Sequence, residues 1–318
     1  MKEFIIKQND SNQRIDKFIT KAMPEIPKSM MYRLIRKKDI KINGKRCENC
    51  TRLNEGDVVR VYVKDDVSAE KQHDMNFLNA PVLSEIIFED ENILTAFKPV
   101  GLDSHSNGTN TDDTLINRIK RYLYEKNEYI PESESTFAPA LCSRLDRNTS
   151  GLVIAAKNAA SLRELNSGIQ NGMVHKVYRC ITTSKPPENE DIVIAYHHRN
   201  ENRNIVEISD KPLCGFREIR TGYKILAEKS GLFLIEVKLF TGRTHQIRAH
   251  LAHIGAPILG DGKYGDISAN KRYRVFRQAL CACKLEFDFP ENSLLHYLNQ
   301  ISPEIDYNFF KYMHGKLM

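Results

Sequence analysis

The apolar pattern of the first 64 residues predicts two short helices followed by a small sheet. One set of apolar side chains recurs at the i, i+3, i+4 and i+7 spacing of a single helical face: Ile15, Phe18, Ile19 and Ala22. After two prolines, Ser29 is expected to cap a second helix with three inward side chains, Met31, Leu34 and Ile35. Short strands are expected at residues 40–42 and 58–63, with Asn43-Gly44 as a hairpin turn.

Beyond this region the pattern predicts a linker and a larger domain that mixes helices and strands. Residues 65–83 are polar and irregular, which is typical of a linker that would let the small domain reorient. We expect residues 84–318 to form one large domain, the catalytic domain. Its predicted elements are a hairpin at 86–97, helices from 113 and at 158–170, a loop at 128–139, and strands at 152–156, 176–182, 191–196 and 231–239.

Charge changes this picture because it is concentrated in the small domain. The chain has 318 residues, of which 41% are hydrophobic and 28% charged, and its formal net charge is +6. Residues 14–46 hold eleven Lys and Arg against three Asp and Glu, so they carry +8 and the rest of the chain about −2. Such a block indicates a nucleic-acid partner, although a solvated helix face would also be basic. The candidate phosphate ligands are Lys17, Arg33, Arg36, Lys37, Lys38 and Lys45.

Other features favour a cytoplasmic protein without metal. No apolar run is long enough to span a membrane, and the start of the chain lacks the apolar core of a signal peptide. Seven cysteines, an odd number, favour reduced thiols. Cys47 and Cys50 form one close pair and Cys281 and Cys283 form another, but the two pairs could make a zinc site only if their separate predicted domains met. Three histidines also suggest a metal site, but no nearby acid completes their ligand set: His245, His250 and His253.

The strongest chemical candidate lies near the middle of the chain, in residues 143–151. Asp146 stands between Arg144 and Arg147, before a Thr-Ser-Gly turn and an apolar run. Nearby positive charge favours the ionised form of a carboxyl group, so we expect a carboxylate that accepts hydrogen bonds or acts as a nucleophile. On these residues alone, a structural ion pair is the commoner interpretation.

The order of several motifs points to a known family. Residues 144–151, Arg-Leu-Asp-x-x-Thr-Ser-Gly, resemble the catalytic motif of the RluA-type RNA pseudouridine synthases, which isomerise uridine in RNA. The resemblance covers roughly residues 84–290. Four further segments match the family pattern in order: Lys98-Pro99-Val100-Gly101, Lys176-Val177-Tyr178, residues 242–250 and residues 257–265. The first 64 residues resemble the S4 RNA-binding domain, which binds structured RNA mainly through its backbone.

The resemblance implies an α/β (α+β) fold: a small S4-like domain, and a catalytic domain with a bent, largely antiparallel mixed sheet flanked by helices. It implies that Asp146 acts as nucleophile or stabilises charge, that Tyr178 packs on the uracil, and that Arg248 orients Asp146. Arg243 is the second choice for that orienting role. Arg144 would fill the gap left by the flipped nucleotide. His245, Gln246 and His250 could be structural or could contact RNA, and a structural role is favoured. Because the isomerisation gains no atoms and changes no oxidation state, no cofactor or metal is expected.

Two positions depart from the family pattern, and several functions remain as alternatives. Ser143 and Cys281 stand where His is usual, which puts RNA contacts or substrate choice in doubt. Large-subunit ribosomal RNA is the favoured substrate, because a leading S4-like domain resembles that branch of the family. The alternatives are transfer RNA as the substrate, or a non-catalytic RNA-binding or assembly factor. The protein is expected to be a monomer. A glycoside hydrolase is disfavoured, because no second acid accompanies the motifs.

Overall fold

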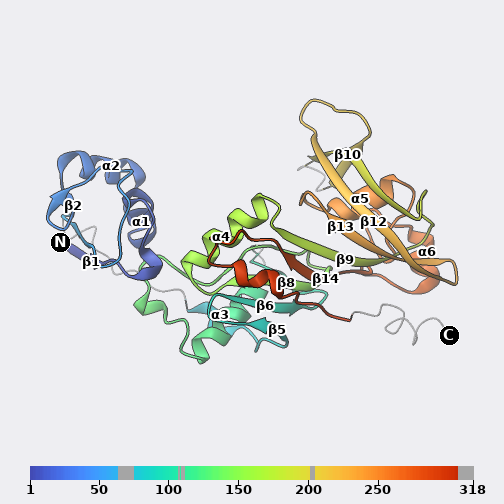
Figure 1. Cartoon of the computed structure of the whole chain (residues 1–318), viewed down its shortest axis with the longest axis horizontal. Helices are drawn as coiled ribbons and strands as arrows, with labels where there is room; N and C mark the ends of the chain where they lie inside the picture. Colours follow the sequence, from blue (N-terminus) through green and yellow to red (C-terminus); the bar gives the residue numbers. More distant parts are fainter. Residues whose placement is uncertain (64–74, 107, 109–111, 201–204, 307–318) are drawn as a thin grey trace.

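Two sheets organise the chain (Figure 1). The computed structural model describes residues 1–63, 75–106, 108, 112–200 and 205–306. The smaller, N-terminal sheet has the strand order β1-β4-β2-β3, with every pair antiparallel. The elements of this domain are β1 (Lys2–Ile5), η1 (Gln8–Asp10), α1 (Ile15–Ala22), α2 (Lys28–Lys37), β2 (Ile40–Ile42), β3 (Lys45–Arg46) and β4 (Val58–Val61).

The predicted helices and turn of this domain are confirmed, with one correction. The apolar face of α1 is fully buried, together with the three inward side chains predicted for α2. Asn43 and Gly44 both have positive φ, 51° and 75°, as a type I′ hairpin turn requires. The expected cap was wrong: Pro27 precedes α2 as its N-cap, and Ser29 lies inside the first turn. Proline suits a helix start because the first N–H groups have no intrahelical partner.

The larger sheet is mixed and almost entirely antiparallel, as expected. Its order is β11-β10-β12-β13-β9-β14-β8-β6-β5, with β7 paired to β8, and β14–β8 is its parallel pair. In Figure 1, β10 and β12 rise steeply from the plane of β6 and β8, so the sheet is bent. The strands are β5 (Ile86–Glu89), β6 (Ile93–Lys98), β7 (Ala140–Leu141), β8 (Ser150–Ala156), β9 (Val174–Thr182), β10 (Glu190–Asn200), β11 (Ile205–Ser209), β12 (Arg217–Lys229), β13 (Leu232–Leu239) and β14 (Leu280–Phe287).

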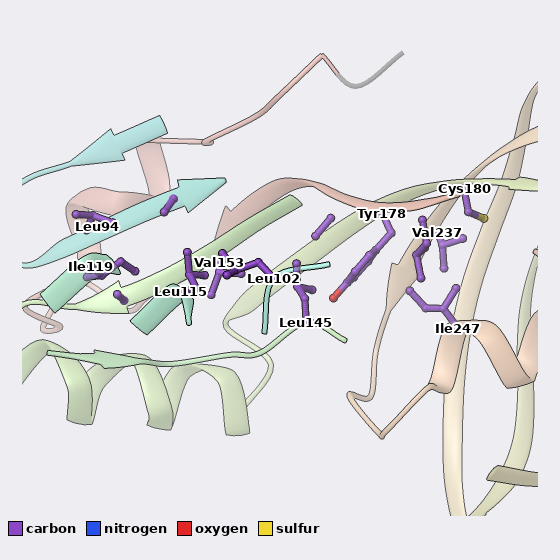
Figure 2. Close-up of a cluster of buried hydrophobic side chains, with 14 of the residues drawn as sticks. Leu94, Leu102, Leu115, Ile119, Leu145, Val153, Tyr178, Cys180, Val237 and Ile247 are labelled. Carbon is purple, nitrogen blue, oxygen red and sulfur yellow. The ribbon is translucent and has the colours of Figure 1, made fainter. Parts of the chain in front are cut away.

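Strand β8 lies at the centre of the core, which explains its apolar run from Leu152 to Ala156. Val153 and Ala155 face a cluster that includes side chains of α3 (Figure 2), whereas Leu152 and Ile154 face a second cluster that includes Leu165 of α4. A strand covered on both faces needs apolar residues at every position. The helical elements of this domain are η3 (Asn76–Asn79), α3 (Leu115–Glu125), η4 (Pro131–Ser133), α4 (Ala159–Gln170), α5 (Gln246–His253), α6 (Ile267–Tyr273) and η5 (His296–Gln300).

The end of the predicted linker is packed against the catalytic domain. Residues 64–74, most of the predicted linker at 65–83, lie outside the described residues. Phe77 of η3 is 2% exposed, and its ring lies 5.8 Å from that of Tyr124 and 5.9 Å from that of Tyr129. The packed chain of this domain therefore begins before residue 84, where we had expected it to start.

Candidate active site

Close contact between two strands places the loop that carries Asp146. Gly151, at the start of β8, lies opposite Ala282 of β14, and Ala282 lies opposite Tyr178 of β9. The φ of Gly151 is +119°, and a Cβ atom there would come within 2.2 Å of the Ala282 carbonyl oxygen. Only glycine fits such an approach. Because of this register, the loop that carries Asp146 comes close to Tyr178 of β9, and both residues line one cleft although they are far apart in sequence.

The segment at residues 98–104 holds the backbone of the same loop. The Lys98 Nζ atom donates to the carbonyl oxygens of Leu102 at 2.7 Å and Arg147 at 3.0 Å. The Gly101 N–H donates to the same Arg147 oxygen at 2.8 Å, and the Ser104 hydroxyl donates to Leu145 O at 3.0 Å. Lys98 is fully buried, and burial lowers its pKa to about 8. The Lys-Pro-x-Gly motif thus holds Arg147, and Ser104 just after it holds Leu145, so the segment at residues 98–104 contacts the residues on both sides of Asp146.

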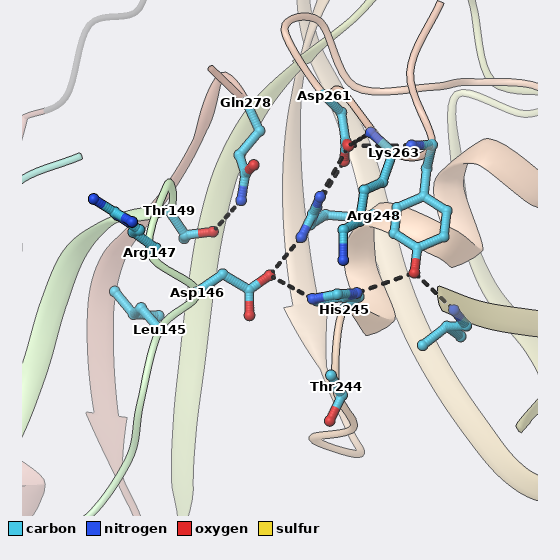
Figure 3. Close-up of polar contacts among 12 residues, drawn as sticks. Leu145, Asp146, Arg147, Thr149, Thr244, His245, Arg248, Asp261, Lys263 and Gln278 are labelled. Carbon is cyan, nitrogen blue, oxygen red and sulfur yellow. Dashed lines mark hydrogen bonds and ion pairs between the residues drawn. The ribbon is translucent and has the colours of Figure 1, made fainter. Parts of the chain in front are cut away.

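Arg248 connects Asp146 to a second carboxylate (Figure 3). Its Nη1 atom lies 2.8 Å from Asp146 Oδ2, while Nε and Nη2 donate to the two oxygens of Asp261 at 2.7 and 2.9 Å. The Asp146 side chain is 32% exposed, Arg248 is 7% exposed and Asp261 is fully buried. Burial would raise the pKa of Asp261, but hydrogen bonds and charge from Arg248 outweigh burial and lower it. The arginine is therefore held by Asp261 and presents one N–H edge to Asp146.

His245 approaches Asp146 from the other side. Its Nε2 atom lies 3.7 Å from Asp146 Oδ2, and its Nδ1 atom lies 3.0 Å from the hydroxyl of Tyr264. The Tyr264 hydroxyl accepts a hydrogen bond from Val206 N–H and can donate its own proton to His245 Nδ1. In that tautomer the ring proton of His245 is on Nε2 and faces Asp146. Burial lowers the pKa of His245 despite the neighbouring carboxylate. His245 also has a φ of 54°, uncommon for a residue other than glycine.

A cleft of about 80 Å³ brings the predicted catalytic residues together. Asp146, Tyr178, Arg248, Arg144 and Arg243 all line it. Tyr178 is 5% exposed, burial raises the pKa of its hydroxyl, and in Figure 2 that hydroxyl points toward Leu145. Arg144 and Arg243 are exposed at the rim. The site thus combines a partly exposed carboxylate, an aromatic ring and two exposed cations.

The predicted phosphate ligands lie in the other domain. All six candidates are exposed: Lys17 on α1, Arg33, Arg36 and Lys37 on α2, Lys38 just after it, and Lys45 on β3. Lys17 faces the junction between the two domains, and the others lie elsewhere on the small domain. The structure therefore separates the candidate RNA ligands into a cleft group and a small-domain group.

The sequence analysis missed one functional candidate in the site and disfavoured another. Asp261 was assigned no role although it lies in a quoted motif, and His245, for which a structural role was favoured over an RNA contact, lines the cleft. Asp261 is also a second acid near the site, contrary to the expectation that none would be present. It cannot serve as the partner carboxylate of a glycoside hydrolase, because it is fully buried and both of its oxygens bind Arg248.

Neither departure from the family pattern changes the atoms around Asp146. Cys281 is fully buried on β14, where burial raises the pKa of its thiol to about 12, and it does not line the cleft. Ser143 precedes the lining residue Arg144. Gln246 and His250 are buried and share Thr221, whose Oγ1 atom lies 3.1 Å from Gln246 Nε2 and 2.9 Å from His250 Nδ1.

His250 leads to a prediction about acid stability. Burial, followed by the charge of His253, lowers its pKa to about 4, whereas an unfolded chain has a histidine pKa of about 6.5. The unfolded state therefore binds more protons between these values, and the free energy of unfolding should fall as the pH drops from about 6.5 to 4, by about 3 kcal/mol. In urea titrations at several pH values, the free energy of unfolding of His250→Gln should depend less on pH than that of the wild type. An exposed control, His175→Gln, should retain the wild-type slope; equal slopes for all three would contradict the assignment.

The described residues contain neither a cluster of metal ligands nor a membrane-spanning helix. Among the residues that the structure describes, no three His, Cys, Asp or Glu side chains gather as a metal site would require. The two cysteine pairs considered for zinc lie in different domains, one near β3 and one on β14. In the same described ranges, no helix is long and apolar enough to cross a bilayer.

The fold and the site together define a class of protein: an RNA-modifying enzyme with a basic binding domain and a carboxylate held in a mixed-sheet cleft. Comparison with known proteins agrees. Residues 92–253 match the family model described as RNA pseudouridylate synthase, and residues 13–59 match the S4 domain. The chain belongs to the RluA-type family of RNA pseudouridine synthases and carries an N-terminal S4 domain.

Relatives align along nearly the whole chain. An uncharacterized RNA pseudouridine synthase of Mycoplasma capricolum is 34% identical over 302 residues, covering 94% of this chain and 95% of that protein. The ribosomal large subunit pseudouridine synthase C of Vibrio parahaemolyticus is 31% identical over 300 residues, covering 90% and 88%. Among solved structures, human RNA pseudouridylate synthase domain containing 4 has a TM-score of 0.57 at 20% identity, covering 72% of this chain and 90% of that one. That structure supports the fold.

Proposed function

We propose that this RNA pseudouridine synthase modifies large-subunit ribosomal RNA. The observation that carries the proposal is the alignment with the ribosomal large subunit synthase of Vibrio parahaemolyticus, which extends across 90% of this chain and therefore through both domains. The S4 domain supports the choice, because its exposed basic side chains suit a structured RNA with many accessible phosphates.

The reaction exchanges two bonds: the bond from C1′ passes from N1 to C5 of the uracil, and one proton leaves C5 while another is gained by N1. The N1–C1′ glycosidic bond breaks, the uracil turns, C5 bonds to C1′, the proton on C5 leaves, and N1 gains a proton. We assign Asp146 as the group that attacks the base or the sugar, or stabilises positive charge on the sugar. Two observations support this assignment: its side chain is 32% exposed in the cleft, and Arg248 contacts only one of its oxygens, Oδ2. The other oxygen is available for the reacting atoms.

Arg248 is the proposed orienting residue for Asp146. Its guanidinium is fixed by two hydrogen bonds to buried Asp261, so the third N–H edge has a defined direction. Positioning by a rigid, planar donor limits the motion of the carboxylate and holds it in the reactive geometry. Arg243, the second choice, lines the same cleft, but its described hydrogen bond is made by its backbone N–H to Gln246.

The remaining cleft residues fit a flipped-out uridine. Removing a base from its stack costs a few kcal/mol, and stacking on an aromatic ring returns roughly 1–3 kcal/mol. Tyr178 is the proposed ring, because its hydroxyl end faces the cleft beside Leu145 while its body is packed in the core. Arg144 is exposed at the rim, where its side chain can enter the space that the nucleotide leaves.

The substrate proposal is tested by offering both kinds of RNA. Unmodified ribosomal RNA and transfer RNA, each labelled with [5-³H]uridine, are incubated separately with the protein, and released tritium is counted. We expect release from ribosomal RNA, with a stoichiometry of one or a few uridines per molecule, and negligible release from transfer RNA. Release from transfer RNA alone would overturn the choice of substrate while leaving the isomerase activity in place.

A further inference from the structure

The two domains are docked on each other through hydrogen bonds between polar side chains. Asn9 Oδ1 accepts from the backbone N–H of Ala159, the first residue of α4, at 3.0 Å. The Thr136 hydroxyl donates to Asp10 Oδ1 at 2.6 Å and accepts from Gln13 Nε2 at 2.9 Å. These contacts join the turn that precedes α1 to the catalytic domain.

A basic pocket of about 260 Å³ lies along this junction. In Figure 1, α1 is on the side of the small domain that faces α4. Lys17 and Lys21 of α1 line the pocket together with Arg52, and Arg163 of α4 lines it from the catalytic domain. We call these four residues the junction cations. They come from both domains, so neither domain forms the pocket alone.

The junction cations have no acidic partner in the described chain, whereas the neighbouring Arg14 has one. Arg14 is neutralised by Asp16 through two hydrogen bonds of 3.1 and 2.6 Å. In contrast, none of the junction cations lies within 4 Å of a described carboxylate oxygen. Of the nearby acids, Glu164 accepts a hydrogen bond from Ser293 at 2.7 Å. The pocket therefore presents an excess of positive charge, of which the Glu164 carboxylate beside Arg163 offsets a part.

Two arginines from opposite domains converge on one turn. Arg52 Nη1 donates to Asn12 O at 2.6 Å, and Arg163 Nη1 donates to Ser11 O at 3.4 Å. Burial, followed by the like charge of Arg52, lowers the pKa of Arg163. Like charges brought together in this way repel each other, and an anion between them would relieve the repulsion.

We propose that the junction pocket binds the sugar-phosphate backbone of the substrate RNA, so that one stretch of RNA contacts both domains at once. This inference rests on the proposed function, since it takes RNA as the substrate. Guanidinium and ammonium groups are the usual partners of phosphate oxygens, and the fork of an arginine matches phosphate in two hydrogen bonds. Because the ligands come from both domains, bound RNA also stabilises the docked arrangement.

The test measures how RNA affinity depends on salt. Ribosomal RNA binding is titrated at several salt concentrations for Arg52→Gln, Arg163→Gln and the double variant. Each lost phosphate contact should reduce the slope of log affinity against log salt by about 1, so the double variant should lose about 2. The matched control is Arg272→Gln, an exposed arginine of α6 that lines neither pocket and should leave the slope unchanged. Thermal unfolding confirms that each variant is folded.

The outcomes separate this inference from the proposed function. Slopes for the junction variants equal to that of Arg272→Gln, with wild-type pseudouridine formation intact, would overturn the junction site alone. Reduced slopes in the junction variants, with no isomerisation of ribosomal RNA by the wild type, would support the junction site and remove the proposed substrate. Slopes reduced by about 1 in each single variant and by about 2 in the double variant, with a wild type that isomerises ribosomal RNA, support both the junction site and the proposed function.

Discussion

Asp146→Asn is expected to abolish pseudouridine formation while leaving the fold and RNA affinity close to those of the wild type. Asparagine has the same shape and keeps an oxygen that can accept from Arg248, which Asp261 continues to hold. The substitution removes only the negative charge at the reacting centre. We expect the single-turnover rate to fall at least about a thousandfold, equivalent to about 4 kcal/mol of activation free energy.

The rate is measured by digesting the RNA to nucleosides and separating pseudouridine from uridine by chromatography. The control is Asp288→Asn, which removes one negative charge at an exposed position just after β14 and should keep wild-type turnover. RNA affinity is measured in parallel to show that the substrate still binds. Turnover by Asp146→Asn within tenfold of the wild type would exclude an essential role for the carboxylate.

Arg248→Met is expected to impair both stability and activity, because Arg248 serves two carboxylates. Asp261 is fully buried, and without the guanidinium only the backbone N–H groups of Lys263 and Tyr264, at 2.8 and 3.1 Å, would stabilise it. Removing one partner of a buried ion pair typically costs about 3–5 kcal/mol. We therefore expect the free energy of unfolding to fall by about that amount, and turnover to fall with it because Asp146 loses its orienting contact.

Urea titration of Arg248→Met gives the loss of stability, and a second substitution identifies its cause. Adding Asp261→Asn removes the uncompensated charge, so the double variant should recover part of the stability without recovering activity. Arg248→Lys keeps the charge but cannot form the fork to Asp261 and the contact to Asp146 together, so its activity should also be low. If the double variant is no more stable than Arg248→Met, burial of an unpaired Asp261 is not the source of the loss.

Local patterns predicted the elements whose burial is simple. The helix α1 follows a single apolar face, and β8 is apolar at every position from Leu152 to Ala156 because both of its faces are covered. The strands β11, β12 and β14 were not predicted. In β12 only Ile219, Thr221, Gly222 and Tyr223 are buried and most of the strand is exposed, so the alternation of apolar and polar residues is weak. Sheet pairing rather than local sequence determines that strand.

The site was only partly predictable, for a related reason. Motif order placed Asp146, Tyr178 and Arg248 in one cleft, and the structure brings these three together. The role of Asp261 depends on a contact across thirteen residues and on complete burial, neither of which a local pattern reveals. The ring of His245 lies near Asp146 because the His245 backbone is left-handed at the start of α5. A local sequence pattern does not predict that conformation.

The central claim is that this chain isomerises uridine in large-subunit ribosomal RNA through Asp146. It is tested most directly by tritium release from [5-³H]uridine-labelled, unmodified ribosomal RNA, because the tritium leaves when C5 bonds to C1′. We predict release by the wild type and none above background by Asp146→Asn, with both proteins bound to the RNA. Equal release by the two proteins would contradict the role of Asp146, and no release by the wild type, although it binds the RNA, would contradict the claim as a whole.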